Sequence, residues 1–119
     1  MNVVVLPYRT YHNIRGPISK YVDNAKIITL LNKDFIDIST DYWIDIIDKR
    51  LKRLAEKYRN GNIILILSFK AMISSIVFYK MTEFFDKFYI AAWDNRISQY
   101  IMYVYENKEV RRFYGERID

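Results

Sequence analysis

The sequence contains no cysteine and only one histidine, His12, in 119 residues. Without cysteine, the chain cannot form a disulfide, a thiolate metal site or a cysteine nucleophile. A multi-histidine metal cage within one chain is also excluded, because it requires several imidazoles. We therefore expect a protein that binds no metal and no other cofactor.

Glycine is scarce too, with only Gly16, Gly61 and Gly115, far apart in the chain. This excludes a glycine-rich dinucleotide fingerprint and a phosphate-binding P-loop. No apolar run approaches the ~20 residues that a membrane-spanning helix requires. The chain begins directly with a predicted strand, without a basic n-region or cleavage signal. We expect a cytoplasmic protein with no membrane partner.

Apolar residues, by contrast, are abundant: the chain is 51% hydrophobic and 17% aromatic, with eleven tyrosines. This length and composition predict one folded domain over residues 1–119. A net charge of +5 favours a polyanionic partner such as a nucleotide or nucleic acid. Because such a charge also serves solubility, and tyrosine fills cores as well as stacking on bases, both interpretations stay open.

The clearest pattern is a strand–helix–strand unit at residues 62–96. Residues 63–67 form an unbroken apolar run, as in a strand buried on both faces. Apolar residues then follow the spacing of one helix face, and residues 88–93 form a second apolar run. The short crossover predicts that these two strands are parallel neighbours.

The helix of this unit is apolar well beyond one stripe, since Met72, Phe78 and Phe85 flank its core positions. A helix that is apolar most of the way round needs a cover on its second side. In so small a protein, a homodimer contact is the simplest cover.

Further strands are predicted at 2–6, where Pro7 ends the strand, at 26–31 and at 97–105. Helices are predicted near 18–22 and over 40–59. Together these elements predict an α/β fold: a single-domain, mostly parallel open sheet of about five strands with helices on both faces. The last strand is expected to lie antiparallel at the sheet edge.

The ends of these elements carry weaker signals. Ser39 or Thr40 is expected to cap the helix over 40–59, and Gly61 lies just beyond its end. The charged tail over 106–119 is expected to form a short helix or to fray.

Polar residues follow the predicted parallel strands, whose carboxyl ends form the usual ligand crevice of open α/β sheets. The candidate ligand-binding residues are Arg9, Thr10, Asn13, Ser68, Phe69, Lys70, Asn95 and Arg96. Cations and amides predominate in this set, which suits a phosphate-bearing ligand, and the rings of Tyr8, Tyr11 and Phe69 could stack on bases. In the alternative interpretation, Ser68 is only a helix cap and Lys70 is only solvated.

RNA phosphodiester cleavage requires little of such a site, because the 2′-hydroxyl of the substrate is the nucleophile. The candidate catalytic residues are His12, Lys70 and Asp94. Lys70 could stabilise charge, and His12 could shuttle a proton near neutral pH. A structural role for His12 in its loop is an equal alternative.

Residues 62–105 resemble a known family. The segment Ile-Leu-Ser-Phe-Lys-Ala-Met-Ile-Ser-Ser-Ile-Val-Phe-Tyr resembles the last helical unit of CARF domains, the cyclic-oligoadenylate sensors of type III CRISPR systems. The segment Phe-Tyr-Ile-Ala-Ala-Trp-Asp-Asn-Arg-Ile-Ser-Gln-Tyr-Ile resembles the strand–turn–strand of small CRISPR-associated ring nucleases. The resemblance implies a homodimer that binds cyclic tetra-adenylate across its two-fold axis, and in some members cleaves it without metal. It also implies that Lys70 contacts the ligand and that Asp94 and Arg96 line the pocket.

A second hypothesis is a DNA- or RNA-binding protein of an archaeal virus or plasmid. It would act through the basic helix over 40–59 and the arginine-rich tail. A third is an interaction module without a ligand, in which tyrosines and charges serve only packing and solubility.

Overall fold

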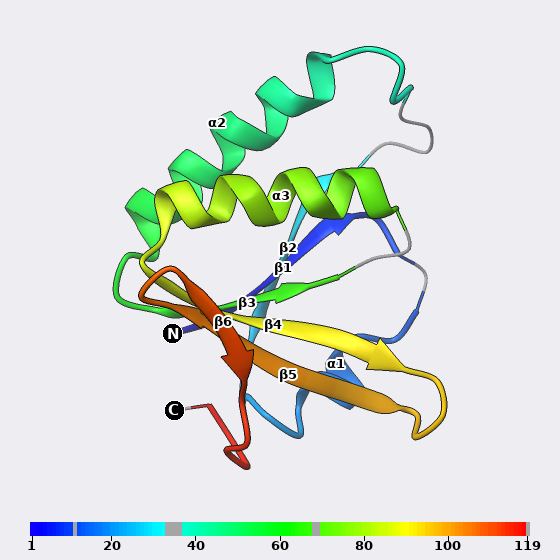
Figure 1. Cartoon of the computed structure of the whole chain (residues 1–119), viewed down its shortest axis with the longest axis vertical. Coiled ribbons are helices and arrows are strands. Elements are labelled where there is room, and N and C mark those ends of the chain that lie inside the picture. The colour runs from blue at the N-terminus through cyan, green and yellow to red at the C-terminus, as the bar shows by residue number, and fades with distance from the viewer. Residues whose placement is uncertain (11, 33–36, 68–69, 119) are drawn as a thin grey trace.

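The computed structural model describes residues 1–10, 12–32, 37–67 and 70–118, which form one sheet with helices on both faces (Figure 1). The strand order is β2-β1-β3-β4-β5-β6. The strands are β1 (Asn2–Tyr8), β2 (Lys26–Leu31), β3 (Asn62–Ile66), β4 (Lys87–Asp94), β5 (Gln99–Glu106) and β6 (Glu109–Arg112). The helices are α1 (Arg15–Ile18), α2 (Tyr42–Lys57) and α3 (Ala71–Phe84).

The first four strands run parallel, since β1 pairs with β2 and β3, and β3 pairs with β4. Strands β5 and β6 are antiparallel to their neighbours. The predicted α/β class and the parallel part of the sheet are therefore confirmed. Because the chain leaves β1 for β2 on one side and later enters β3 on the other, the strand order switches between β1 and β3. Open α/β sheets bind ligands outside the carboxyl ends of the strands at such a switch point.

The sheet separates two apolar cores, because successive side chains of a strand point to opposite faces. In β1, Val3 and Val5 face the core formed with α2 and α3, whereas Val4 and Leu6 face the core formed with α1. All four are buried, so this strand is covered on both faces. In Figure 1, α2 and α3 lie side by side over one face of the sheet, and α1 lies on the other.

The C-terminal part of the sheet corrects two predictions. There are six strands rather than about five, and β5 is not at the edge because β6 pairs along its outer side. Between them, Asn107 and Lys108 adopt positive φ angles of 56° and 62°. Two such residues in succession make the tight hairpin turn whose twist matches that of the strands. The tail therefore turns back as a strand, which rules out the expected short helix.

The predicted element boundaries also shift near the two prolines. Strand β1 continues through Pro7 to Tyr8, which pairs with Leu31 of β2. Pro7 donates no hydrogen bond, but the strand tolerates one missing donor. The short helix begins at Arg15, earlier than predicted, so that Pro17 lies in its first turn. The first-turn N–H groups of a helix have no partner within the helix, so proline is accommodated there.

The predicted cap of α2 is wrong. Its N-cap is Asp41, and no side-chain hydrogen bond caps the helix. The Thr40 hydroxyl instead donates to the Asp37 carbonyl at 2.8 Å, and the Ser39 hydroxyl donates to the Asp37 carboxylate at 2.6 Å. Both side chains are thus used in the turn that precedes the helix. None of the helices in the described ranges combines the length and apolar character needed to cross a bilayer.

Candidate ligand cleft

A cleft of about 630 Å³ opens at the carboxyl edge of the sheet, where the strand order switches. This volume lies within the range of small-molecule sites, roughly 300–1,000 Å³. Its lining comes from the ends of β1, β3 and β4, the start of β5, and the loop that follows β1. The lining residues are Leu6, Tyr8, Thr10, His12, Asn13, Ile14, Pro17, Ile66, Leu67, Trp93, Asn95 and Tyr100.

One wall of the cleft is an exposed indole. The Trp93 side chain is 40% exposed, although it lies near the end of a central strand. Its indole N–H donates to the Asn95 Oδ1 at 2.7 Å, and its ring meets Tyr100 edge to face at a centroid distance of 5.1 Å. Tyr100 is buried, and desolvation raises its phenol pKa. These contacts fix the indole plane while leaving part of it accessible to a ligand.

Tyr8 and Lys70 lie together on the β1 side of the same edge. The Lys70 ammonium lies 5.7 Å from the centroid of the Tyr8 ring, within the range of a cation–π contact. Lys70 is the N-cap residue of α3, and its side chain is exposed. Tyr8 lines the cleft, so this contact places the Lys70 ammonium beside the cleft, although Lys70 is not one of the lining residues.

The loop after β1 supplies most of the polar lining. The Arg9 N–H donates to the Leu31 carbonyl at 3.2 Å, and the His12 N–H donates to the Thr10 Oγ1 at 3.2 Å. The Gly16 N–H donates to the Asn13 Oδ1 at 3.2 Å, which joins the loop to α1. The structure thus brings the predicted residues Thr10, His12 and Asn13 to one cleft, while Arg9 does not line it.

Asp94 and Arg96 are placed differently from the other predicted residues, because they bind each other. The Arg96 guanidinium donates to both carboxylate oxygens of Asp94, at 3.2 and 2.9 Å, and its backbone N–H donates at 3.0 Å. The Arg96 side-chain hydrogen bond holds the pKa of the Asp94 carboxyl below its usual value. Neither residue is among those lining the cleft. An acid with a lowered pKa is a poor proton donor at neutral pH.

Some predicted residues lie outside the described part of the chain. These are Ser68 and Phe69, together with Tyr11 as a possible stacking residue. Of the remaining set, Asn95 lines the cleft. The sequence interpretation missed Trp93 and Tyr100, which were assigned only to strands. A large aromatic residue directly before the polar Asp94–Arg96 segment was the available signal.

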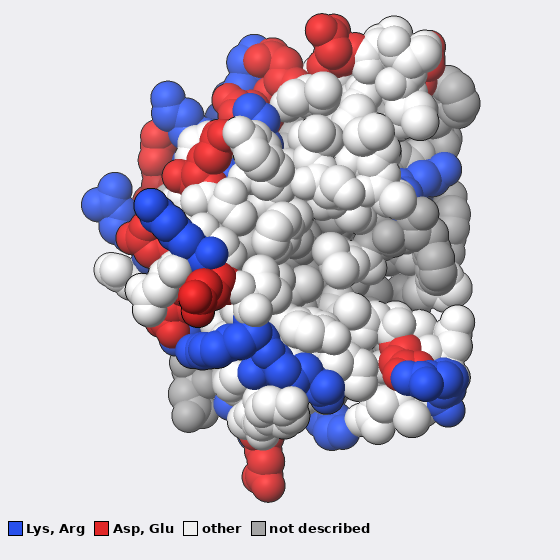
Figure 2. Space-filling model, viewed as in Figure 1, with Lys and Arg blue, Asp and Glu red and all other residues white. Residues whose placement is uncertain are grey.

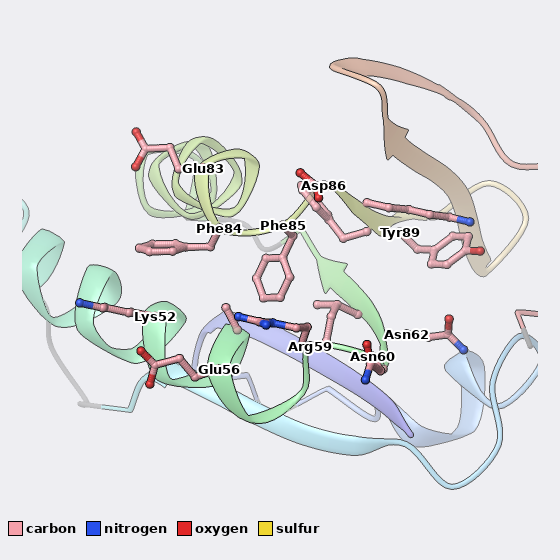
Figure 3. A pocket seen from close by; sticks show the side chains of 15 residues that line it. Lys52, Glu56, Arg59, Asn60, Asn62, Glu83, Phe84, Phe85, Asp86 and Tyr89 are labelled. Carbon is pink, nitrogen blue, oxygen red and sulfur yellow. The ribbon is translucent and has the colours of Figure 1, made fainter.

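A second cleft, of about 710 Å³, lies at the amino edge of the parallel strands (Figure 3). Phe84 and Phe85 lie between the ends of α2 and α3, with Lys52 and Glu56 on α2 and Glu83 on α3. Its charged lining residues are Lys52, Glu56, Arg59, Glu83, Asp86 and Lys87. Three cations and three carboxylates leave no preference for a ligand of either sign. No predicted site residue lies there.

The basic helix and tail use many of their charges within the chain. In α2, Lys49 pairs with Asp45 at 2.8 Å, and Arg50 donates to the Leu30 carbonyl. In the tail, Arg111 pairs with Glu106 at 3.0 Å, and Arg117 pairs with Asp23 at 2.6 Å. The ion pairs partly neutralise the charge of the helix and the tail, whereas Arg50 keeps its charge because a carbonyl is neutral. The second hypothesis therefore stays a prediction.

The chemistry of the carboxyl-edge cleft would suit a flat, polar ligand. Its walls are mostly apolar and aromatic, and its polar groups include an imidazole, three hydroxyls and two amides, with an ammonium nearby. Within residues 1–10, 12–32, 37–67 and 70–118, no three histidine, aspartate or glutamate side chains cluster as metal ligands would. Comparisons with protein-family models, curated proteins and solved structures find no match to this chain.

Proposed function

We propose that this protein binds a nucleotide ligand in the carboxyl-edge cleft, and that the ligand is a cyclic oligoadenylate such as cyclic tetra-adenylate. The observation that carries the proposal is the Trp93 indole, which Asn95 and Tyr100 hold partly exposed at the cleft. Stacking of a base on such a ring contributes about 1–3 kcal/mol. The Lys70 ammonium, beside Tyr8, supplies a cation for a phosphate.

The cyclic form and the adenine base rest on the resemblance of residues 62–105 to CARF domains and ring nucleases. A cyclic tetra-adenylate presents four bases, whereas the cleft of one chain presents one exposed indole. One cleft therefore engages one base of the ring, and the other bases remain available to the clefts of further copies.

Cleavage is a separate step of this proposal. The ligand's 2′-hydroxyl would attack the adjacent phosphorus and break its bond to the 5′-oxygen, leaving a 2′,3′-cyclic phosphate and a 5′-hydroxyl. His12, on the cleft wall, would move the proton, and Lys70 would stabilise the phosphoryl charge. Asp94, paired with Arg96, would position that guanidinium rather than transfer a proton.

Binding is tested by thermal unfolding and calorimetric titration with cyclic tetra-adenylate, its linear counterpart and inorganic phosphate. At a ligand concentration 100 times Kd, we expect a stabilisation of about 2.7 kcal/mol. Trp93→Ala should weaken binding about 10- to 100-fold, the loss of one stacked base. Lys70→Ala should weaken it and reduce its salt dependence, because a phosphate contact is lost.

The matched control is Lys52→Ala, which removes an exposed lysine from the other cleft and should leave binding unchanged. Equal binding by the Trp93→Ala variant would contradict the cleft assignment. Retardation of generic duplex DNA, without a response to cyclic tetra-adenylate, would support the nucleic-acid hypothesis instead. Chromatography of the ligand after incubation in a chelator tests metal-independent cleavage.

A further inference from the structure

The outer side of α3 is apolar and exposed. Met72 and Tyr79, seven residues apart and so on the same side of the helix, are 56% and 59% exposed. Ile76 lies between them on that side and is only half-buried. Large apolar residues in such a row usually mark a contact surface. In Figure 2, uncharged side chains fill the middle of this view, while charged ones cover its left side and form a blue band across its lower part.

The sheet face beside α3 is also incompletely covered. Helices α2 and α3 pack on the part of the sheet formed by the central strands, and β5 and β6 extend beyond them (Figure 1). On that face, Tyr103 and Tyr105 of β5 are only half-buried, and Val110 of β6 is 50% exposed. Phe78 of α3 meets Tyr105 edge to face at 6.2 Å, so the helix and the open strands form one continuous surface.

We propose that this continuous surface binds a second copy of the chain, with α3 of each copy packed on the β5–β6 face of the other. Among the described residues, nothing packs on the outer side of α3, and no helix covers the β5–β6 face of the sheet. A dimer with a two-fold axis buries both surfaces at once, because an isologous interface uses the same patch of each copy.

The charges on this surface suit the same arrangement. Arg112 lies on the β5–β6 face, where its guanidinium is 5.9 Å from the centroid of the Tyr103 ring. Glu83 is exposed near the end of α3, on the side of Met72 and Tyr79. Each copy therefore carries a carboxylate on its helix and a guanidinium on its strands. In the proposed dimer, the carboxylate of one copy faces the guanidinium of the other.

The size requirement is modest for this chain. A standard interface buries about 800 Å² of each partner. That is about one tenth of the 7624 Å² that the chain exposes, and the uncharged surface extends over most of the face in Figure 2.

The surface does not depend on the proposed ligand. It lies on the opposite face of the sheet from Leu6, Ile66 and Tyr100, which line the cleft. It reaches the carboxyl edge through Met72, two residues after Lys70. Dimer formation and ligand binding can therefore fail independently in an experiment.

The test is the molar mass of the full chain by light scattering during size-exclusion chromatography at about 100 µM, a concentration chosen to populate even dimers of micromolar affinity. We expect a mass of twice 14.5 kDa for the unchanged protein. Tyr79→Arg on the helix and Val110→Glu on the strand should each give monomers, because each disrupts both contacts of the dimer. An equimolar mixture of the two should recover dimers, since one contact is then unaltered and the other joins arginine to glutamate.

Ile38→Glu is the matched control, because Ile38 is 58% exposed but lies in the segment before α2. It should remain dimeric, and circular dichroism should show that all variants are folded. A monomeric mass for the unchanged protein overturns the proposal. A folded Val110→Glu variant that stays dimeric also overturns it, because the strands would then lie outside the interface. Failure of the mixture to recover dimers excludes the helix-to-strand arrangement.

Discussion

At the scale of single residues, the ion pair of Asp94 and Arg96 shows how the fold changes the role of a predicted site residue. Both residues were expected to line a pocket. In the structure they form two side-chain hydrogen bonds with each other, and neither lines the cleft. The turn after β4 brings them together, because Arg96 follows Asp94 by two positions and its backbone N–H also donates to the carboxylate.

The lowered pKa of Asp94 predicts a pH dependence of stability. The hydrogen bond from Arg96 favours the ionised carboxylate in the folded state, so the pKa is lower there than in the unfolded chain. Its contribution is therefore present above the unfolded pKa, about 3.9, and is lost as pH falls through the folded pKa. We expect Asp94→Asn to lower the free energy of unfolding near pH 6 and to have little effect near pH 2. Urea unfolding at several pH values measures this difference, and a difference that grows on acidification would contradict it.

At Gly61, glycine is required because a neighbouring backbone segment passes too close for a side chain, not because of its own backbone conformation. Its position after α2 suggested a left-handed helix end, but no described glycine has a positive φ. A Cβ at Gly61 would lie 2.7 Å from the Met1 carbonyl oxygen, which accepts the Asn62 N–H at 2.9 Å. The backbone of the first residue thus passes too close for a side chain.

Gly61→Ala should therefore lower the free energy of unfolding by about 1–3 kcal/mol, the usual effect of overpacking. Asn60→Ala is the control, since Asn60 is exposed beside it and should change stability little. Chemical denaturation of both variants checks the prediction, and equal stability of the two would refute the close-contact explanation.

At the scale of elements, the C-terminal segment is tied to the sheet rather than frayed. The Phe113 N–H donates to the Met102 carbonyl at 2.9 Å. Beyond it, Ile118 is buried in the core that contains α1, and its N–H donates to the Tyr21 carbonyl at 2.7 Å. The end of the chain thus covers part of the sheet face that the four-residue helix α1 leaves open.

Ile118→Ala should consequently destabilise the protein by about 2 kcal/mol or more, within the range of buried isoleucine truncations. The change should also speed hydrogen exchange of the Phe113 amide. Tyr114→Ala, at a side chain that is 83% exposed, provides the comparison. An Ile118→Ala variant as stable as Tyr114→Ala would show that the segment is not anchored in solution.

At the scale of the whole molecule, one sheet contributes to both cores, so the two cannot separate without breaking its strands. We expect unfolding to be cooperative, as in most single domains of this size. Trp43 belongs to α2 and is buried in the core between that helix and the sheet, whereas Trp93 lies on the opposite side of the sheet. Fluorescence of the Trp93→Phe variant therefore reports the α2 side alone.

The midpoint of its fluorescence transition should coincide with the midpoint from far-ultraviolet circular dichroism at each protein concentration. The two midpoints should agree because both cores unfold together as a single cooperative unit. Two separated midpoints would show that the core around α1 unfolds independently of the core around α2.

Much of the fold was predictable because its signals are local. The apolar runs of β1 and β3, the spacing in α2 and α3, and the short crossover between β3 and β4 depend on neighbours in the chain. The placement of Thr10, His12, Asn13 and Asn95 at one edge followed from the parallel strands.

Tertiary structure alone decided the features that depend on residues far apart in sequence. Strand β6 exists because β5 offers it an unpaired edge, although all four of its residues are exposed and three of them are charged. Trp93 became a cleft wall because Tyr100 and the loop after β1 meet it there, which no local pattern records. The sequence by itself determined most of the helices and strands and the parallel direction of the first four strands, since periodicity and short crossovers are local. The cleft and the open α3 surface were decided only when those segments packed, because both are properties of contacts between them.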